Sequence, residues 1–327
     1  MAFEKRQLRE GAAISGAAAG PASIVVAAAG TQRRLRLRRD HWGYLFIAPW
    51  VLGFLVFQGG PLIASLYYSL TEYDILSSPK FVGLDNYHYA LTGDPLFWQS
   101  LWRTCYFALL AVPLGLIGSI LLAILLNQGL RGSSFFRTFF YIPSLTPAVA
   151  MAILWSWLLH PTLGLANQIL KDMHLAPYAW LTEKGTVIPT LVMISLWAGV
   201  GGNTMLIFLA ALQGVPKDLE EAAELDGAGA FQKFRVITLP MISPVILFNL
   251  ILSIIASFQV FSLAFVATDG GPSYGSWFMI LHIYNQAFYY FRLGYGAALS
   301  WIFLAILLAI TSAIFLSARR WVYYQGA

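Results

Sequence analysis

The sequence predicts an all-α protein that crosses a membrane six times. Of its 327 residues, 58% are hydrophobic and only 11% are charged, and the mean hydropathy is +0.68. Soluble domains use about 25% charged residues, so this chain lacks the side chains for a fully solvated surface. Stretches of the roughly 20 apolar residues that cross a bilayer occur at about 43–70, 98–126, 136–159, 187–212, 241–267 and 295–318.

The segment before the first stretch, residues 1–40, is a basic N-terminal tail. Its Ala/Gly-rich part at 11–30 looks like a secretory signal, with Lys5, Arg6 and Arg9 in front of it. However, the dense basic run at 33–39 follows at once and would hinder export of that segment. We interpret residues 1–40 as a cytoplasmic tail; the alternative is a helix lying on the membrane surface.

The basic residues also predict the orientation of the membrane domain, residues 41–320. With the N-terminus inside, the outer loops are 71–97, 160–186 and 268–293, and the short C-terminal tail, 321–327, is cytoplasmic. Of the 20 Lys and Arg residues, only Lys80, Arg103, Lys171, Lys184 and Arg292 then fall outside. Because Lys and Arg accumulate on the cytoplasmic side, both termini are predicted to be inside. We expect the outer loops to form short helices on the outer face.

A loop between the fourth and fifth stretches, residues 214–240, carries a dense acidic cluster. Its members are Asp218, Glu220, Glu221, Glu224 and Asp226. Pro216 suits the start of a helix, where the nearby carboxylates favour the helix dipole. Gly227 and Gly229 permit a break, and Phe231, Phe234 and Ile237 predict a second short helix before the fifth span. Such a helix–turn–helix could dock a partner; alternatively, the charges only solvate a loop.

Residues in this loop resemble the EAA loop of binding-protein-dependent ABC importer permeases. The matching positions are Glu221-Ala222-Ala223, Gly227, Ile237, Leu239 and Pro240. The run Glu221–Ala228 is similar to the carbohydrate-uptake branch, which includes maltose and glycerol-phosphate permeases. The similarity covers about residues 40–320 and includes Phe81–Tyr87, Tyr141-Ile142-Pro143 and Gly270-Gly271-Pro272.

The resemblance implies a type I ABC importer permease fold in the bacterial cytoplasmic (inner) membrane. It implies as partners a second homologous permease, two ATP-binding subunits and an extracytoplasmic solute-binding protein. The residues implied to couple the permease to the ATPase are Glu220, Glu221, Ala222, Ala223, Asp226 and Gly227. No Gly-x-x-x-x-Gly-Lys phosphate loop occurs in the sequence. We therefore expect no cofactor in this chain, with ATP and Mg bound by the partner ATPases.

Polar residues inside the spans are candidates for the solute path, because polar groups are costly in hydrocarbon and tend to face a cavity. The candidates are Gly199, Gly202, Asn203, Asn249, Ser253, Ser257 and Gln259. Aromatic neighbours such as Trp197 and Phe258 would suit the apolar faces of a sugar. Close helix packing is the alternative for Ser and Gly, and an interhelical hydrogen bond for Asn and Gln. The resemblance implies a sugar site at Gly199, Gly202, Ser253 and Ser257, although the tyrosine that the family places at Gly202 is absent.

The function expected from the resemblance is ATP-driven import of a sugar or oligosaccharide by alternating access. An importer subunit for glycerol phosphate or a phosphodiester is the alternative within the same family. A membrane scaffold or enzyme with a chance loop match is the alternative outside it. Nothing in the sequence predicts a catalytic group, a metal site or nucleic-acid binding, so we expect a transporter subunit and not an enzyme.

Overall fold

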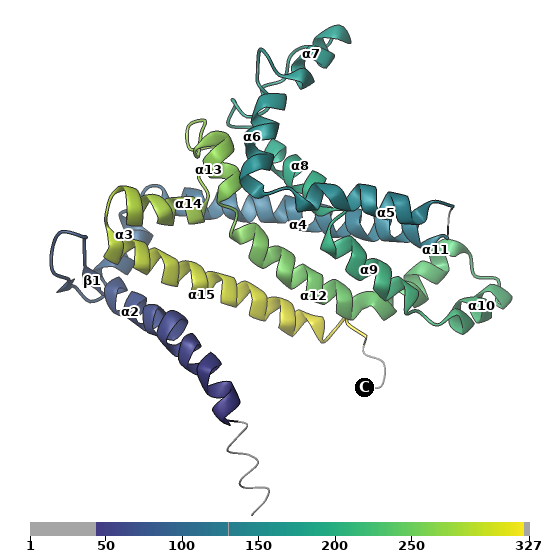
Figure 1. Cartoon of the computed structure of the whole chain (residues 1–327), viewed down its shortest axis with the longest axis horizontal. Coiled ribbons are helices and arrows are strands. Elements are labelled where there is room, and N and C mark those ends of the chain that lie inside the picture. Colours follow the sequence, from purple (N-terminus) through teal and green to yellow (C-terminus); the bar gives the residue numbers. More distant parts are fainter. Residues whose placement is uncertain (1–43, 130, 324–327) are drawn as a thin grey trace, which may run out of the picture. The chain divides into compact units, whose positions relative to one another are not determined.

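The structure is a computed structural model that describes residues 44–129 and 131–323. The predicted tail at 1–40 and residues 324–327 of the C-terminal tail lie outside the described residues. The chain divides into two units, Met1–Ala64 and Ser65–Ala327. The described part is almost entirely helical (Figure 1).

In the first unit the chain is helical from Tyr44, in a helix that continues to Ser69. This helix contains a π-helical turn, Leu55–Gly59 (η1), before α2 (Gly60–Ser69). Pro61 explains the turn, because its ring would clash with the carbonyl of Phe57 in a regular helix. A π-turn widens the backbone at that point and lets the helix continue.

Within the described residues, four helices are long and apolar enough to cross a membrane: Tyr44–Ser69, Phe97–Asn127, Ala230–Thr268 and Leu293–Ala318. Two more spans are possible if each of two bent helix pairs crosses as a unit. The helical membrane fold predicted from the sequence is therefore confirmed. The elements of the spans are α4 (Phe97–Asn127), α5 (Ser133–Tyr141), η2 (Ile142–Leu145), α6 (Ala148–Leu158), α8 (Val187–Gly199), α9 (Asn203–Gln213), α12 (Leu239–Phe258), α13 (Ser262–Thr268) and α15 (Leu293–Ala318).

The predicted third span, 136–159, is bent by 94° between Ser133–Leu145 and Ala148–Leu158. The bend falls at Thr146, whose backbone is extended because the next residue is Pro147. The predicted fourth span is bent by 52° between α8 and α9, at the Val200-Gly201-Gly202 segment. Proline and glycine thus divide two spans that hydropathy alone treats as continuous.

On the predicted cytoplasmic side, α10 (Lys217–Leu225) precedes α11 (Ala230–Lys233). The predicted second short helix begins at Ala230, but it does not end before the fifth span. α11 continues through a π-helical turn, Phe234–Thr238 (η3), into α12, and the helical unit runs from Ala230 to Thr268. Pro240 did not stop the helix because the carbonyl that it would meet, at Val236, lies in the widened turn.

The loops predicted to be outside contain short helices. These are α3 (Asp85–Thr92), α7 (Leu165–Asp172), α14 (Met279–Tyr284) and a π-helical turn, Asn285–Tyr289 (η4). The first outer loop also has a two-residue antiparallel pair, β1 (Thr71–Glu72) with β2 (Lys80–Phe81). Asn86 closes this loop by donating to the carbonyls of Ser69 (3.0 Å) and Thr71 (2.9 Å). The Phe81–Tyr87 motif therefore shapes the loop around the end of α2.

The second unit packs around α4, which lies beside α8, α9, α12 and α14 (Figure 1). One buried cluster joins α4 to α6 and α8 through Phe107, Ala152 and Leu191. A second joins α4 to α9 and α12 near the predicted cytoplasmic end. A third joins the outer end of α4 to α15. α4 is therefore the central helix of this unit, and the helices around it either pack against it or leave a cavity beside it.

Candidate solute path and coupling surface

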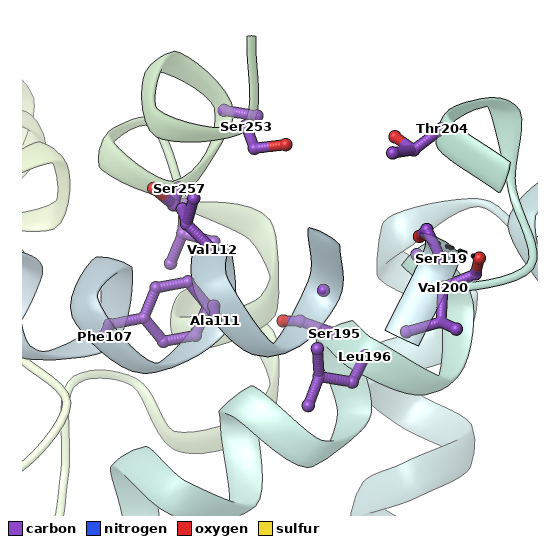
Figure 2. A pocket seen from close by; sticks show the side chains of 14 residues that line it. Phe107, Ala111, Val112, Ser119, Ser195, Leu196, Val200, Thr204, Ser253 and Ser257 are labelled. Atoms are coloured by element: carbon purple, nitrogen blue, oxygen red, sulfur yellow. Dashed lines mark hydrogen bonds between the residues drawn. The ribbon is translucent and has the colours of Figure 1, made fainter. Parts of the chain in front are cut away.

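A cavity of about 250 Å³ lies between α4, α8, α9 and α12 (Figure 2). Serine, threonine and apolar side chains line it, and Phe107 closes one part of the wall. Figure 2 shows Ser253 of α12 and Thr204 of α9 at opposite sides of the space, with the Ser253 hydroxyl pointing into it. Of the predicted path residues, Gly199, Ser253 and Ser257 line this cavity.

A second cavity, of about 500 Å³, shares Ser195, Gly199 and Thr204 with the first. It extends toward the bend before α6 and toward α13. Of the predicted path residues it is lined by Gly199, Gly202, Asn203 and Gln259. Pockets for small ligands measure roughly 300–1,000 Å³, so the two adjoining spaces together have the size of a small-solute site.

The hydroxyls and amides around the two cavities differ in what they can offer a solute. Ser195, Ser257 and Ser119 each donate their hydroxyl hydrogen to a backbone carbonyl, at 2.9 Å in every case. In the described structure, the side chains of Thr204, Ser253 and Gln259 form no hydrogen bond within the protein. Unlike the first set, this second set keeps both its donors and its acceptors for a bound molecule.

No charged side chain lines either cavity among the described residues. Apolar ring faces are supplied by Phe107 in the first cavity and by Phe261 in the second. The combination of uncharged hydrogen-bonding groups and aromatic faces suits a neutral, hydroxyl-rich molecule. A phosphate would find no cationic partner in this lining.

Three residues that the sequence placed at or beside the solute path line neither of these two cavities. Asn249 lines neither cavity; it is buried and donates to the Val245 carbonyl of its own helix at 2.9 Å. The expected aromatic partners do not line the cavities either. Phe258 stacks on Phe303 of α15, at 5.8 Å between ring centroids, and Trp197 packs edge-to-face on Trp155. The side of the helix on which each residue lies could not be read from its position within an apolar run.

Sequence reasoning missed Ser119, Ser144 and Phe107 as lining residues. Ser144 comes directly after Tyr141-Ile142-Pro143, a segment already recognised in the sequence, so its position in the family pattern was an available signal. The Tyr141 hydroxyl also donates to Oδ1 of Asn203, at 3.1 Å. Phe107 gave no signal, because it is one apolar residue in a 31-residue apolar helix.

The break between α8 and α9 is held open by close backbone contact. A Cβ atom at Gly201 would lie 2.0 Å from the carbonyl oxygen of Phe140 in α5. A Cβ atom at Gly202 would lie 3.1 Å from that of Ser144. Gly199, by contrast, has open space around its Cβ position. Glycine at 201 is thus required for packing, whereas Gly199 leaves room in the cavity wall.

In the loop predicted to be cytoplasmic, α10 ends in a Schellman motif. Gly227 has a positive φ of +80°, and its N–H donates to the Glu224 carbonyl at 3.0 Å. The N–H of Ala228 donates to the Ala223 carbonyl at 2.9 Å, which completes the motif. Lys233 on α11 pairs with Glu224 across the turn. The α10–α11 angle is therefore fixed by backbone and side-chain contacts.

The predicted coupling residues lie on this structured turn. Glu221, Ala222, Asp226 and Gly227 are exposed, and Ala223 is half-buried. Glu220 faces inward and lines a cavity of about 280 Å³ with Asn127 and Gln128 from the end of α4. Two apolar side chains beside the carboxylates are strongly exposed, Leu225 at 90% and Phe231 at 77%. In residues 44–129 and 131–323, no group of three or more His, Cys, Asp or Glu side chains is placed to hold a metal ion.

The family described as "Binding-protein-dependent transport system inner membrane component" matches residues 97–323. The chain belongs to this family. The resemblance drawn from the EAA loop is confirmed, and the chain is a membrane-spanning permease of an ABC importer. Membership implies a binding protein and an ATPase as partners, and the inner membrane as its location.

Several relatives resemble this permease over most of its length. The "Probable ABC transporter permease protein YesP" of Bacillus subtilis (strain 168) is 38% identical over 295 residues, covering 89% of this chain and 94% of the relative. The "Arabinooligosaccharides transport system permease protein AraP" of the same organism is 34% identical, covering 82% and 85%. The "sn-glycerol-3-phosphate transport system permease protein UgpA" of Escherichia coli O157:H7 is 35% identical, covering 88% and 97%.

The fold also matches a solved structure. A chain of a bacterial alginate ABC transporter, crystallised in complex with an alginate pentasaccharide-bound periplasmic protein, superposes with a TM-score of 0.78. The match covers 87% of this permease and 96% of that chain, at 23% sequence identity. It confirms the type I importer permease fold.

Proposed function

We propose that this permease imports a neutral sugar or oligosaccharide that an extracytoplasmic binding protein delivers. The observation that carries the proposal is the lining of the two adjoining cavities. Thr204, Ser253 and Gln259 retain free hydrogen-bonding groups, and Phe107 and Phe261 offer ring faces. Sugar hydroxyls need such uncharged donors and acceptors, and the apolar face of a sugar ring packs on aromatic side chains. The printed name of AraP, an arabinooligosaccharide permease, agrees with this solute class.

Glycerol phosphate is the second candidate solute, because the UgpA relatives carry it in their names. The lining favours the sugar, since a phosphate is normally held by Arg, Lys or clustered backbone N–H groups. The purified complex, reconstituted in vesicles with its binding protein, separates the two. We expect a neutral sugar from a panel to stimulate ATP hydrolysis; stimulation by glycerol 3-phosphate alone would contradict the proposal.

The two serines of α12 provide a matched test of the solute path. Ser253 has a free hydroxyl in the cavity, whereas Ser257 donates its hydroxyl to the Ile254 carbonyl. A hydrogen bond contributes about 0.5–1.5 kcal/mol, so Ser253→Ala should raise the solute concentration for half-maximal uptake by roughly 2–10-fold. Ser257→Ala should change it by less than about twofold. Equal effects of the two substitutions would argue against this path.

In the coupling step of the proposal, α10 seats in a cleft of the ATPase and Glu221 pairs with a basic group there. The exposed Leu225 and Phe231 beside the carboxylates support a partner-covered surface, since apolar patches of this kind mark interaction sites. The proposed assembly holds a second homologous permease and two ATPase subunits, which bind ATP and Mg. Both termini of this permease then face the cytoplasm.

Charge reversal at Glu221 tests this coupling. Glu221→Lys should abolish uptake while the protein still inserts and accumulates in the membrane, because the change replaces attraction by repulsion at the docking surface. Glu183→Lys, an equally exposed reversal in an outer loop, is the matched control and should leave uptake intact. Normal uptake by the Glu221→Lys permease would remove the coupling role.

A further inference from the structure

A buried polar cluster lies where α14 meets the outer end of α4. Nε2 of His282 is 2.8 Å from Oδ2 of Asp94, and the Tyr295 hydroxyl donates to the same oxygen at 2.5 Å. The indole N–H of Trp277 donates to Nδ1 of His282 at 3.1 Å. His282 is fully buried, and Asp94 and Tyr295 are nearly so. These four residues, which we name the outer clamp, join three chain segments: the residues before α4, α14 with the turn before it, and α15.

The geometry of the outer clamp assigns a hydrogen-bonding role to each nitrogen of its imidazole. An indole N–H can only donate, so Nδ1 of His282 must carry a lone pair. The remaining proton is therefore on Nε2, where it is donated to Asp94. His282 thus uses both ring nitrogens in hydrogen bonds.

Asp94 is the acceptor at the centre of the outer clamp. Burial opposes its ionisation, but the hydrogen bonds from His282 and Tyr295 outweigh that effect and lower its pKa to about 2. Its second oxygen, Oδ1, accepts the N–H of Leu96 at 2.8 Å, directly before α4 begins. The carboxylate is thus satisfied on both oxygens, as a buried charge requires.

Further contacts continue the connection from α14 to the cavity. The N–H of Met279 donates to the Thr104 hydroxyl at 2.9 Å, and Ser100 contacts the Met279 sulfur at 3.2 Å. Immediately before α14, Phe278 packs edge-to-face on Phe107, with ring centroids 5.3 Å apart. Phe107 lines the first cavity (Figure 2). The outer clamp is therefore linked to the proposed solute path through Phe278, which packs on the cavity-lining Phe107.

We propose that Asp94 and His282 are positioning residues that hold α14 against α4 and thereby keep Phe278 packed on Phe107, sealing the outer end of the solute cavity. Neither residue touches the solute; both act through Phe278. The inference rests on the proposed path only in taking the first cavity as the space that is sealed. Loss of the outer clamp should loosen Phe278 and open this cavity to the outer medium.

Cysteine accessibility tests the seal without any knowledge of the solute. In a Cys105→Ser background, Ser253→Cys places a thiol in the cavity, and the probe is a charged methanethiosulfonate reagent added outside intact cells. Adding His282→Leu should raise the labelling rate at position 253 by about tenfold. His282→Gln, which keeps an N–H donor for Asp94, should return the rate to within about threefold of the parent. As a control, a thiol introduced by Ser77→Cys, at an exposed position in an outer loop, should be labelled at the same rate with and without the His282 substitutions.

The pathway of action is tested by a double substitution. Phe278→Ala should raise labelling as much as His282→Leu, and the two together should do no more than either alone. Unchanged labelling in His282→Leu, or additive effects of the two substitutions, would overturn the proposal. Should His282→Leu fail to assemble, Trp277→Phe removes one bond of the outer clamp and must raise the rate in the same direction. Failure to find a transported sugar would leave these rates unaffected, so the two proposals fail separately.

Discussion

Ser253 and Ser257 show that the hydrogen bonds of a single side chain decide whether it can bind a solute. Both are serines on α12, one helical turn apart, and both line the first cavity. Ser257 donates its hydroxyl to the backbone of its own helix, which is a common fate of serine in apolar helices. Ser253 does not, so it can bind a solute. Residue type and spacing predicted the two as equivalent; the side-chain rotamer separates them.

Asp94 gives a prediction at the same scale. Its pKa of about 2 lies below the ordinary 3.8, because the hydrogen bonds from His282 and Tyr295 outweigh burial. A depressed carboxyl pKa stabilises the fold above the unfolded pKa, and this stability is lost as pH falls from about 4 to about 2. The loss should amount to about 2 kcal/mol in the free energy of unfolding.

The measurement is the unfolding temperature of the purified permease in detergent between pH 5 and pH 2. Asp94→Asn should flatten this part of the pH dependence. Asp74→Asn is the control, since the Asp74 pKa is also lowered, chiefly by hydrogen bonds from Ser77, but its side chain is exposed. An Asp94→Asn permease with the parent's acid sensitivity would show that the carboxylate is not a stabilising group.

At the scale of elements, breaks in the helices create the cavity. α8 and α9 diverge by 52° at Gly201 and Gly202, and α5–η2 and α6 by 94° at Pro147. The bends place Ser144, Gly199 and Asn203 around one space. Backbone groups that a bend frees can be satisfied locally, as in the bond from the Gly202 N–H to the Gly199 carbonyl at 3.1 Å. The sequence contained these prolines and glycines, but their presence alone did not predict the bend angles.

Gly201 and Gly199 form a matched pair that tests the element packing. Gly201→Ala would place a methyl group 2.0 Å from the Phe140 carbonyl oxygen, and such overpacking costs about 1–3 kcal/mol. Gly199→Ala meets open space and should change the free energy of unfolding by less than about 0.5 kcal/mol. Thermal unfolding in detergent measures both. Equal unfolding temperatures for the two variants would contradict the close packing of α5 against Gly201.

For the whole molecule, the single cysteine makes the topology directly testable. With Cys105→Ser as the background, a membrane-impermeant maleimide should label Ser77→Cys and Lys171→Cys in intact cells. It should label Gln232→Cys, on the proposed cytoplasmic turn, only after permeabilisation. All three positions are exposed, so access to the reagent and not burial decides the result. Labelling of Gln232→Cys in intact cells would reverse the proposed orientation.

The sequence by itself determined the class of the molecule. Composition and long apolar stretches required a helical membrane protein, and the spacing of Glu221, Gly227 and Pro240 indicated the permease family. These features are local, because hydropathy sums over one segment and the α10 cap is formed by neighbours in the chain. The Schellman motif at Gly227 needs no distant contact. Family membership and the helical fold were therefore within reach of sequence reasoning.

Only the tertiary structure decided which polar and aromatic residues face the cavity. Asn249 and Phe258 line neither cavity, whereas Ser144 and Phe107 do line one. Asp94 contacts His282, which lies 188 residues away in the chain. In an apolar span every face of the helix is hydrophobic, so periodicity does not distinguish lipid, neighbour and cavity. Contacts between distant segments set the direction of each side chain.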